Sequence, residues 1–282
     1  MKPLHFALIG GDVSYSRSPD IFRAIFEQLG CEGCFDLCPT TPENLEAEIR
    51  RLVKCGVTGV SVTLPYKEKI IRHLDSVDDL ARTVGAVNSF AVREGQLCGY
   101  NTDCHGAAFA LRNAGFEGCR QAVIIGSGGA ARALVQTLVA DFGVLQFVLY
   151  GRNAASLANL KHYIVHCDQV LTVQIVTIED SVSTFPSRDS LVVNCTPLGG
   201  PLFPESSPFP NNLIWRQMGF YFDLNYNSDN RVVKAAKAAG LKAIDGSSML
   251  VAQAVRSLEL WTGLEVEYKP VYEQVFPGRN LP

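Results

Sequence analysis

The sequence lacks any apolar run of the ~18 residues that a membrane-spanning helix requires. It also lacks an excess of one charge, because 25 lysines and arginines nearly balance 28 acidic residues and the formal net charge is −3. A basic surface for nucleic acid or an anionic membrane is therefore not expected. The apolar part of residues 1–11 is too short for a signal peptide and predicts a first strand instead.

Cysteine pairs with the spacing of a zinc site are missing as well. Nine cysteines are present, and an odd number in a chain of this length is typical of reduced thiols, which predicts a cytoplasmic protein. Cys31 and Cys34 form a C-x-x-C pair, and the alternative for them is a metal or redox pair. Because no second pair follows, we expect no metal and interpret these thiols as small apolar side chains around a turn.

Alternation of short apolar segments with helical patterns predicts an α/β fold. The 282 residues suggest two domains at about 150 residues each. Strands are expected at 5–9, 35–38, 57–63, 86–92 and 96–100, and helices at 18–29, 42–54 and 103–114. Further strands are expected at 122–125, 146–150, 172–177, 191–195 and 220–224, in a parallel sheet. Residues 196–212, with five prolines, are expected to border a site, and a last helix at 248–262 to pack on the first domain.

A glycine-rich turn at residues 126–131 lies between a predicted strand and a predicted helix. Its G-x-G-x-x-A pattern is typical of dinucleotide binding, since Gly126 allows a tight turn and Gly128 lets the backbone approach a pyrophosphate. Ala131 is small enough for the helix to lie close to the strand. The helix N-terminus then faces the phosphate charge. A tight turn without a ligand is the alternative, but strand, turn and helix together favour a dinucleotide.

The end of the next strand indicates which dinucleotide is preferred. An NAD site places an acidic residue there, whereas this chain reads Tyr150-Gly151-Arg152-Asn153. Arg152 can pair with a 2′-phosphate in bidentate fashion, which predicts NADP rather than NAD. The alternative is a solvated loop arginine.

Lys67 and Asp103 are candidates for acid–base chemistry. Lys67 follows Pro65 and is expected in the first turn of a helix, where the helix dipole disfavours a cation and favours the neutral amine. The alternative is a surface lysine compensated by Glu68. Asp103 begins another predicted helix, where it or Thr102 could be a simple N-cap. A carboxylate beside Lys67 would instead hold that amine in place.

Seven short motifs connect these segments. They are SRSP at 16–19, VTLPYK at 62–67, GAVNS at 85–89, NTD at 101–103, GSGGAAR at 126–132, NCTPLG at 194–199 and MLVAQA at 249–254. Their order and spacing resemble the shikimate dehydrogenase family, including its quinate/shikimate relatives, over nearly the whole chain. The resemblance implies a substrate-binding domain at 1–103, completed by 247–282, and an NADP-binding Rossmann-like domain at 104–246.

The same resemblance implies an NADP-dependent oxidoreductase that interconverts 3-dehydroshikimate and shikimate in aromatic amino acid biosynthesis. Lys67 and Asp103 would be the catalytic pair, with Lys67 as the proton donor. One alternative is a quinate or mixed quinate/shikimate dehydrogenase, and another is a non-catalytic dinucleotide or metabolite sensor. We expect a small-molecule substrate as the partner, no nucleic acid or membrane, and a monomer or homodimer.

Further site residues follow from the resemblance. The substrate-binding residues it implies are Ser16, Ser18, Thr63, Asn88, Asp103, Tyr226 and Gln253. The cofactor-binding residues it implies are Gly126, Ser127, Gly128, Gly129, Ala130, Arg152, Asn153, Thr196, Leu224 and Gly246. For Ser18 the alternative is an N-cap, and for Gln253 an exposed polar residue.

The chain departs from the family pattern at several of these places. Ser61 stands where members often carry asparagine, and Ser156 stands where the NADP loop often has a later basic residue. The segment 223–227 lacks a proline that is common there. These changes leave Lys67 and Asp103 intact and bear on the preference for substrate and cofactor.

Overall fold

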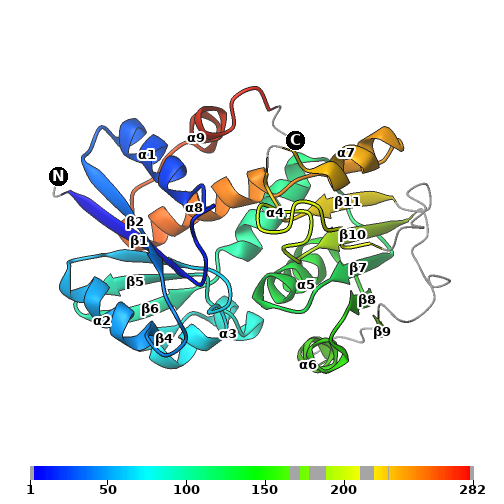
Figure 1. The fold of residues 1–282 in the computed structure, drawn as a ribbon, viewed down its shortest axis with the longest axis horizontal. Coiled ribbons are helices and arrows are strands. Elements are labelled where there is room, and N and C mark those ends of the chain that lie inside the picture. The colour runs from blue at the N-terminus through cyan, green and yellow to red at the C-terminus, as the bar shows by residue number, and fades with distance from the viewer. Residues whose placement is uncertain (1–2, 166–171, 178–188, 210–218, 228, 280–282) are drawn as a thin grey trace. The chain divides into compact units, whose positions relative to one another are not determined.

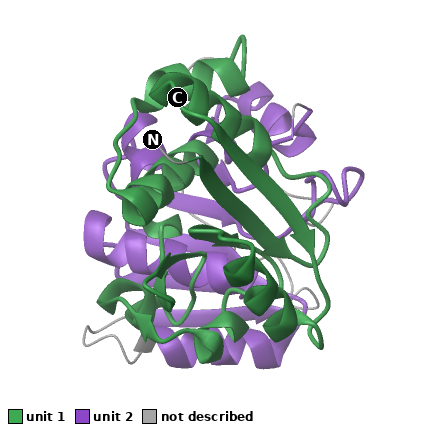
Figure 2. Cartoon of the chain, turned by 90° about the vertical axis from the view of Figure 1, so that its left-hand side faces the viewer, with its two compact units in different colours: residues 1–106, 249–281 green, residues 107–248, 282 purple. Residues whose placement is uncertain are grey.

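The computed structural model describes residues 3–165, 172–177, 189–209, 219–227 and 229–279. The chain divides into two compact units, which Figure 2 colours separately. Unit 1 comprises residues 1–106 and 249–281, and unit 2 comprises residues 107–248 with residue 282. Each unit has a six-stranded sheet of its own.

Unit 1 is built on a mixed sheet with the strand order β2-β1-β3-β5-β6-β4. Its strands are β1 (Leu4–Gly10), β2 (Gly33–Pro39), β3 (Gly59–Val62), β4 (Ser76–Val77), β5 (Ser89–Arg93) and β6 (Gln96–Tyr100). Its helices are α1 (Ser18–Leu29), α2 (Leu45–Lys54), the 3₁₀ helix Lys69–His73, α3 (Asp79–Val84), the start of α4 (Asp103–Asn113), nearly all of α8 (Ser247–Thr262) and α9 (Tyr268–Val275). β1 is parallel to β2 and β3, whereas β5 is antiparallel to β3 and β6. The predicted hairpin of β5 and β6 is therefore confirmed.

Helices cover both faces of this sheet (Figure 1). On one face, α1, α8 and α9 bury an aromatic core in which Phe6, Phe22 and Trp261 are in contact. The predicted packing of the last long helix on the first part of the chain is thus confirmed. On the other face, Leu45 and Ile49 of α2 pack against the strands. Because both faces of the sheet are covered, consecutive residues of β1 and β3 are buried, whichever face their side chains lie on.

Unit 2 contains the parallel sheet that the sequence predicts. Its elements are β7 (Gln121–Ile125), α5 (Gly129–Phe142), β8 (Gln146–Gly151), α6 (Ala154–Val165), β9 (Thr172–Thr177), β10 (Ser190–Asn194), β11 (Phe220–Asp223), α7 (Arg231–Ala238) and β12 (Lys242–Ile244). The strand order is β12-β11-β10-β7-β8-β9, and every neighbouring pair is parallel. From β7 the chain adds β8 and β9 on one side, and it then adds β10, β11 and β12 on the other side. Open α/β sheets bind ligands at such a switch point, here between β7 and β10.

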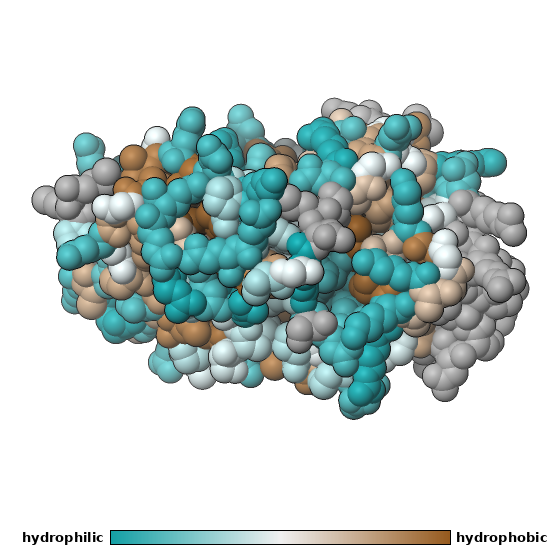
Figure 3. All heavy atoms as spheres, turned by 90° about the horizontal axis from the view of Figure 1, so that it is seen from above, coloured by the Kyte–Doolittle hydropathy of each residue, from teal (hydrophilic) through white to brown (hydrophobic). Residues whose placement is uncertain are grey.

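The surface is mostly polar over the face shown in Figure 3, where apolar residues appear between hydrophilic ones. The part of residues 196–212 that the structure describes, up to Phe209, forms no helix or strand beyond the bridge between Leu198 and Phe203. Phe209 is buried against Tyr221 of β11, which ties the end of this segment to the core. Within the described part of the chain, the helices are too short or too polar to cross a membrane.

The prediction of a helix that begins directly after Pro65 is wrong. Residues 64–68 form turns, and the helical segment that follows is the 3₁₀ helix Lys69–His73. The Lys67 carbonyl accepts from the Val87 N–H at 2.8 Å, so a tertiary hydrogen bond takes the place of a helical one. The dipole argument for Lys67 therefore loses its basis, and the chemistry of this amine has to be judged from its neighbours.

Candidate functional site

Four loops of unit 1 meet at one edge of its sheet. Ser16 and Ser18 follow β1, Lys67 follows β3, Asn88 precedes β5, and Asp103 follows β6. Because β1 and β3 are parallel while β5 runs opposite to both β3 and β6, these four positions all lie at the same edge. Two backbone hydrogen bonds join the loops there, from Gly11 N–H to the Leu64 carbonyl at 2.8 Å and from Val62 N–H to the Asn88 carbonyl at 2.7 Å.

Lys67 and Asp103 form a buried ion pair at this edge. Lys67 Nζ donates to Asp103 Oδ2 at 2.6 Å, and the two side chains are 15% and 6% exposed. Asn101 Oδ1 accepts from the Cys104 N–H in the first turn of α4, whereas both oxygens of Asp103 have other partners. Asp103 therefore holds the lysine, and the interpretations of a simple helix cap and of a surface lysine do not describe these side chains.

Asn88 connects this pair to a wider polar cluster. Its Nδ2 donates to Asp103 Oδ1 at 3.0 Å and to Thr102 Oγ1 at 2.9 Å, and its Oδ1 accepts from the Thr102 N–H at 2.7 Å. Asn88 is 3% exposed, so all of these bonds lie in a region that water barely reaches. Hydrogen bonds in such a region fix geometry well, because leaving any of them unmade is costly.

Gln253 of α8 is directed into the same cluster rather than into solvent. Its Oε1 lies 3.3 Å from Asn88 Nδ2 and 3.4 Å from Thr102 Oγ1, while its Nε2 donates to the Leu250 carbonyl at 2.8 Å. Gly106 allows this approach of α4 to α8, since a Cβ there would lie 2.6 Å from the Met249 carbonyl oxygen. Sequence reasoning did not assign Thr102 or Ser257 to the site, although their hydroxyls are 3.0 Å apart within it.

Ser16 and Ser18 lie next to each other, but Ser18 is not the N-cap that the sequence suggested as an alternative. The N-cap of α1 is Arg17, which makes no side-chain capping bond, and Ser18 is the first helical residue. Ser16 Oγ accepts from the Ser18 N–H at 3.2 Å and donates to Ser18 Oγ at 3.1 Å. The Ser18 hydroxyl is thus left as a buried donor at a helix start, a suitable environment for an anion. Thr63 follows β3 at the same edge, with its methyl group against Gly10.

In unit 2, the glycine-rich turn connects β7 to the start of α5. Gly126 has φ +105°, a conformation that favours glycine, and Gly128 is the N-cap of α5 without a side-chain capping bond. A Cβ at Gly128 would meet no atom within 4 Å, so the described protein itself does not require glycine there. Ala131 is fully buried against the sheet. The role of Ser127, Gly129 and Ala130 in binding a diphosphate stays a prediction from the strand, turn and helix start.

Thr196 lies beside this turn at the switch point of the sheet. A Cβ on Gly126 would be 3.1 Å from Thr196 Cγ2, so the loops after β7 and β10 are in contact. Thr196 is held by Asn194, whose Oδ1 accepts from the Thr196 N–H at 3.0 Å and from Oγ1 at 2.7 Å. Gly246 and Leu224 also meet closely, because a Cβ on Gly246 would lie 2.1 Å from the Leu224 carbonyl oxygen. The structure thus brings these predicted cofactor residues to the carboxyl ends of neighbouring strands.

Asp223 organises the loops at this end of the sheet, and the sequence analysis did not assign it a role. It is fully buried at the end of β11, and its carboxylate accepts from Tyr221 Oη at 2.7 Å, Asn194 Nδ2 at 3.1 Å and both nitrogens of Asn225 at 2.8 and 2.9 Å. Asn225 Nδ2 in turn lies 3.1 Å from the Thr196 carbonyl. Burial raises the pKa of Asp223, although its hydrogen-bond donors oppose that shift.

The remaining predicted residues, Arg152, Asn153 and Tyr226, lie in the loops after β8 and β11 of unit 2. Asn153 Oδ1 accepts from the Ser156 N–H at 3.0 Å and so caps α6, which accounts for this residue without a ligand. Arg152 is exposed, directly after the end of β8. Tyr226 belongs to unit 2, in the loop after β11, whereas the other predicted substrate residues belong to unit 1.

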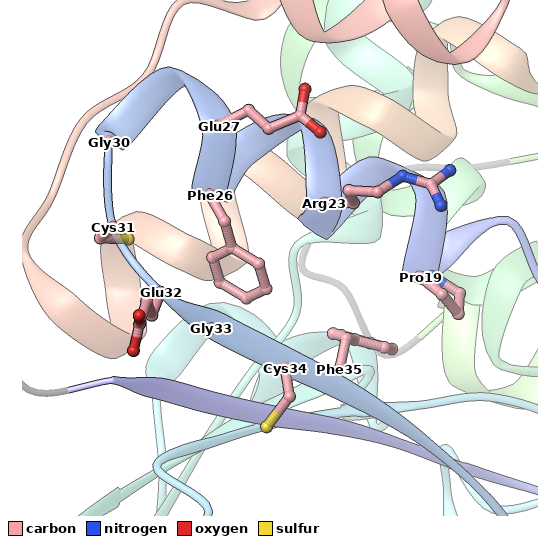
Figure 4. A pocket seen from close by; sticks show the side chains of 10 residues that line it. All are labelled: Pro19, Arg23, Phe26, Glu27, Gly30, Cys31, Glu32, Gly33, Cys34 and Phe35. Carbon is pink, nitrogen blue, oxygen red and sulfur yellow. The ribbon is translucent and has the colours of Figure 1, made fainter.

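A separate cavity of about 530 Å³ lies in unit 1 between α1 and β2 (Figure 4). Pro19, Phe26 and Phe35 line it, together with Cys31 and Cys34. None of the predicted site residues takes part. Cys31 and Cys34 point in different directions in Figure 4, and burial raises the pKa of the Cys34 thiol. No cluster of metal-ligating side chains occurs among the residues that the structure describes.

Comparison with known proteins adds to this picture. The model of the shikimate dehydrogenase substrate binding domain matches residues 8–90, and that of the shikimate 5′-dehydrogenase C-terminal domain matches residues 246–276. The shikimate dehydrogenase (NADP(+)) of Caldanaerobacter subterraneus subsp. tengcongensis is 34% identical over 279 residues, which cover 96% of this chain and 95% of that protein.

Solved structures of members of this family and of related enzymes have a similar fold. The shikimate 5-dehydrogenase of Thermus thermophilus, in complex with NADP(H) and shikimate, has a TM-score of 0.82 and 32% identity, covering 96% of this chain and 98% of that one. The ligand-free 5-ketofructose reductase of Gluconobacter has a TM-score of 0.81 and 25% identity, covering 98% of both chains.

A parallel sheet with a glycine-rich turn in one unit, and a buried Lys–Asp pair in the other, are typical of dinucleotide-dependent oxidoreductases of the α/β class. Since its relatives match at up to 34% identity over nearly the whole length, the chain belongs to the shikimate dehydrogenase family. The predicted family and fold class are confirmed, whereas the roles of individual residues stay predictions.

The raised pKa of Asp223 makes a prediction about stability. A carboxyl whose folded pKa lies above its unfolded value of 3.8 stabilises the protein fully below that value, and this contribution is lost as the pH rises. Asp223→Asn cannot ionise, so its free energy of unfolding should improve relative to the wild type as the pH increases above about 4. Urea unfolding of both proteins between pH 4 and 8 measures this slope, and a flat difference would contradict the assignment.

Asp229 supplies the matched control. It is exposed, and its hydrogen bond with Lys234 lowers its pKa. Its contribution to the free energy of unfolding is present above the unfolded value of 3.8 and is lost as the pH falls below it, so Asp229→Asn should show little slope between pH 4 and 8, and that of opposite sign.

Proposed function

We propose that this protein catalyses the reversible, NADP-dependent interconversion of 3-dehydroshikimate and shikimate. The observation that carries the proposal is the buried pair of Lys67 and Asp103, 2.6 Å apart, within the polar cluster of Asn88 and Gln253 in a member of this family. Relatives that match nearly the whole chain are NADP-dependent shikimate dehydrogenases, and the Thermus enzyme has been seen with both NADP(H) and shikimate.

The substrate is a small ring with several hydroxyls and a carboxylate, and unit 1 offers groups of matching chemistry. Ser16 and Ser18 supply hydroxyl donors beside the start of α1, which suits the carboxylate. Asn88, Gln253 and Thr63 supply short polar groups for the ring hydroxyls, and we assign Tyr226 of unit 2 to the same task. Groups fixed by their own hydrogen bonds orient a substrate at low entropic cost.

Lys67 and Asp103 perform the proton transfer in this proposal. NADPH, when bound, supplies the hydride to the ring carbonyl. Lys67, as an ammonium ion, donates a proton to the carbonyl oxygen as negative charge develops there, and in the reverse direction its amine accepts that proton. Asp103 holds Lys67 Nζ through Oδ2 and is itself held by Asn88 through Oδ1, so one carboxylate fixes the donor in position.

We place the cofactor in unit 2. The turn at 126–130 receives the pyrophosphate, and Thr196, Leu224 and Gly246 border the rest of the site. Arg152, which is exposed after β8, would pair with the 2′-phosphate, since a guanidinium suits a doubly charged group. Asn153 contributes by capping α6 next to it.

Replacing Lys67 tests the mechanism. Lys67→Ala should lower kcat for shikimate oxidation by about 10²–10⁴-fold, the usual contribution of a general acid or base, with the KM for NADP⁺ nearly unchanged. Lys69, exposed two residues later, is the control, and Lys69→Ala should keep full activity. Formation of NADPH is followed by absorbance with shikimate and quinate in parallel. Undiminished turnover by Lys67→Ala would remove it from the mechanism, and faster turnover of quinate by the wild type would reassign the substrate.

Gly128 tests the cofactor site separately from the fold. A Cβ would meet no described atom and φ is −83°, so the lower entropy of the unfolded chain should roughly offset the poorer N-cap, and Gly128→Ala should leave thermal stability nearly unchanged. The same methyl group would occupy the space of the pyrophosphate, so the Kd for NADP⁺ should rise about tenfold or more. Gly126→Ala, with φ +105°, should instead lose stability by about 1–3 kcal/mol. Normal NADP⁺ binding by Gly128→Ala, measured by calorimetry, would argue against this site.

Arg152 tests the choice between NADP and NAD. Arg152→Ala should lower kcat/KM with NADP⁺ by about tenfold, because a charge-assisted pair with the 2′-phosphate is lost, and should leave the value with NAD⁺ within about twofold. Lys161, an exposed cation on α6, provides the control. Equal losses with both cofactors would show that Arg152 does not recognise the 2′-phosphate.

A further inference from the structure

Arg17 stands between Ser16 and Ser18, and its side chain reaches an element more than 250 residues away in the sequence. Nη2 donates to the Val275 carbonyl at 2.8 Å, and Cζ lies 5.2 Å from the centre of the Phe276 ring. Nε donates to Asp20 Oδ2 at 2.6 Å, within α1. One guanidinium thus joins the start of α1 to the end of α9.

The end of α9 is well suited to receive a cation. α9 has no basic residue in its own last turn, and Val275 is its final residue, so the Val275 carbonyl belongs to the negative end of the helix. Phe276 is 3% exposed, and its ring carries the guanidinium of Arg279 at 5.0 Å in addition to that of Arg17. Arg17 therefore caps α9 and packs on a rigid, buried aromatic group.

Few hydrogen bonds connect the two serines themselves to other described residues, although Gly11 and the buried Val13 anchor the start of their loop. The Ser16 N–H donates to the Val13 carbonyl at 3.0 Å, and the other bonds of the two serines that the structure gives run between Ser16 and Ser18 themselves. α1 begins without a side-chain capping bond. Since Arg17 is the N-cap residue between the two serines, fixing its side chain on α9 fixes the backbone that carries both hydroxyls.

We infer that Arg17 is a positioning residue, which holds Ser16 and Ser18 in place for the substrate by clamping their loop to the end of α9. This inference rests on the proposed function of the two serines. The competing explanation is that Arg17 merely forms a surface ion pair with Asp20, a type of contact that contributes little. The chain contains a control for this explanation, because Arg23 pairs with the same carboxylate through Asp20 Oδ1 at 2.5 Å and lies on α1 away from the serines.

The experiment compares Arg17→Ala, Arg17→Lys, Phe276→Leu and Arg23→Ala by steady-state kinetics and by hydrogen exchange of residues 11–18. Arg17→Ala should raise the KM for shikimate about five- to tenfold, leaving kcat and the KM for NADP⁺ within about twofold, and should speed exchange in the loop. Arg17→Lys keeps the charge but lacks the planar fork of donors, so its KM for shikimate should lie between those of Arg17→Ala and the wild type. Phe276→Leu should show a smaller shift in the same direction, and Arg23→Ala should match the wild type.

Ser16→Ala separates the two ways in which this could fail. If Ser16→Ala raises the KM for shikimate while Arg17→Ala changes neither the KM nor exchange of residues 11–18, the clamp is refuted and the proposed substrate site stands. If Ser16→Ala leaves the KM unchanged, the proposed role of the serines is wrong, and the exchange data still decide whether Arg17 orders the loop. Equal effects of Arg17→Ala and Arg23→Ala would assign the result to Asp20 and overturn the inference.

Discussion

The carboxylate of Asp103 is the constraint on which the arrangement of unit 1 depends. A buried ion pair is tolerated when each charged atom has good partners, because desolvation otherwise outweighs the attraction. Here one oxygen faces Lys67 and the other faces Asn88, and Asn88 is in turn held by the Thr102 N–H. The antiparallel β5 and β6 bring the Asn88 and Asp103 loops together, so a structural feature of the sheet also satisfies an electrostatic requirement.

Unit 2 contains a second buried carboxylate, that of Asp223, whose burial is compensated by different partners. Asp223 has no cation among its hydrogen-bond partners, and it is satisfied by a phenol, a backbone N–H and two amides instead. Burial accordingly raises its pKa, and the loops after β10 and β11 are held by neutral donors. In the proposed cofactor site, the attraction for the pyrophosphate would come from the backbone and the helix start at the glycine-rich turn, which suit a diphosphate by shape as well as charge.

Local sequence patterns predicted the features that depend on neighbours in the chain. The parallel sheet of unit 2 and the turn at 126–131 follow from apolar periodicity and from the backbone freedom of glycine, and both are found. The helix after Pro65 was wrong because the Lys67 carbonyl bonds to Val87, a contact set by the tertiary fold. The roles of Arg17 and Asp223 were missed for the same reason: Val275 and Asn194 are distant in sequence, and no local pattern marks a partner that far away.

The choice of substrate has to lie in the side chains rather than in the fold. A 5-ketofructose reductase shares this fold at a TM-score of 0.81, so the fold alone does not specify the substrate. Ser61 lies on β3 between Leu8 of β1 and Ser89 of β5, and it is 7% exposed. It shares its face of the sheet with Ser89, which accepts from the Trp261 indole of α8 at 2.9 Å. In the proposed site, the short side chain of Ser61 would leave the ring hydroxyls to Asn88, Gln253 and Thr63. Because Asn88 and Gln253 hold each other at 3.3 Å, selectivity in this proposal depends on how firmly that cluster is held.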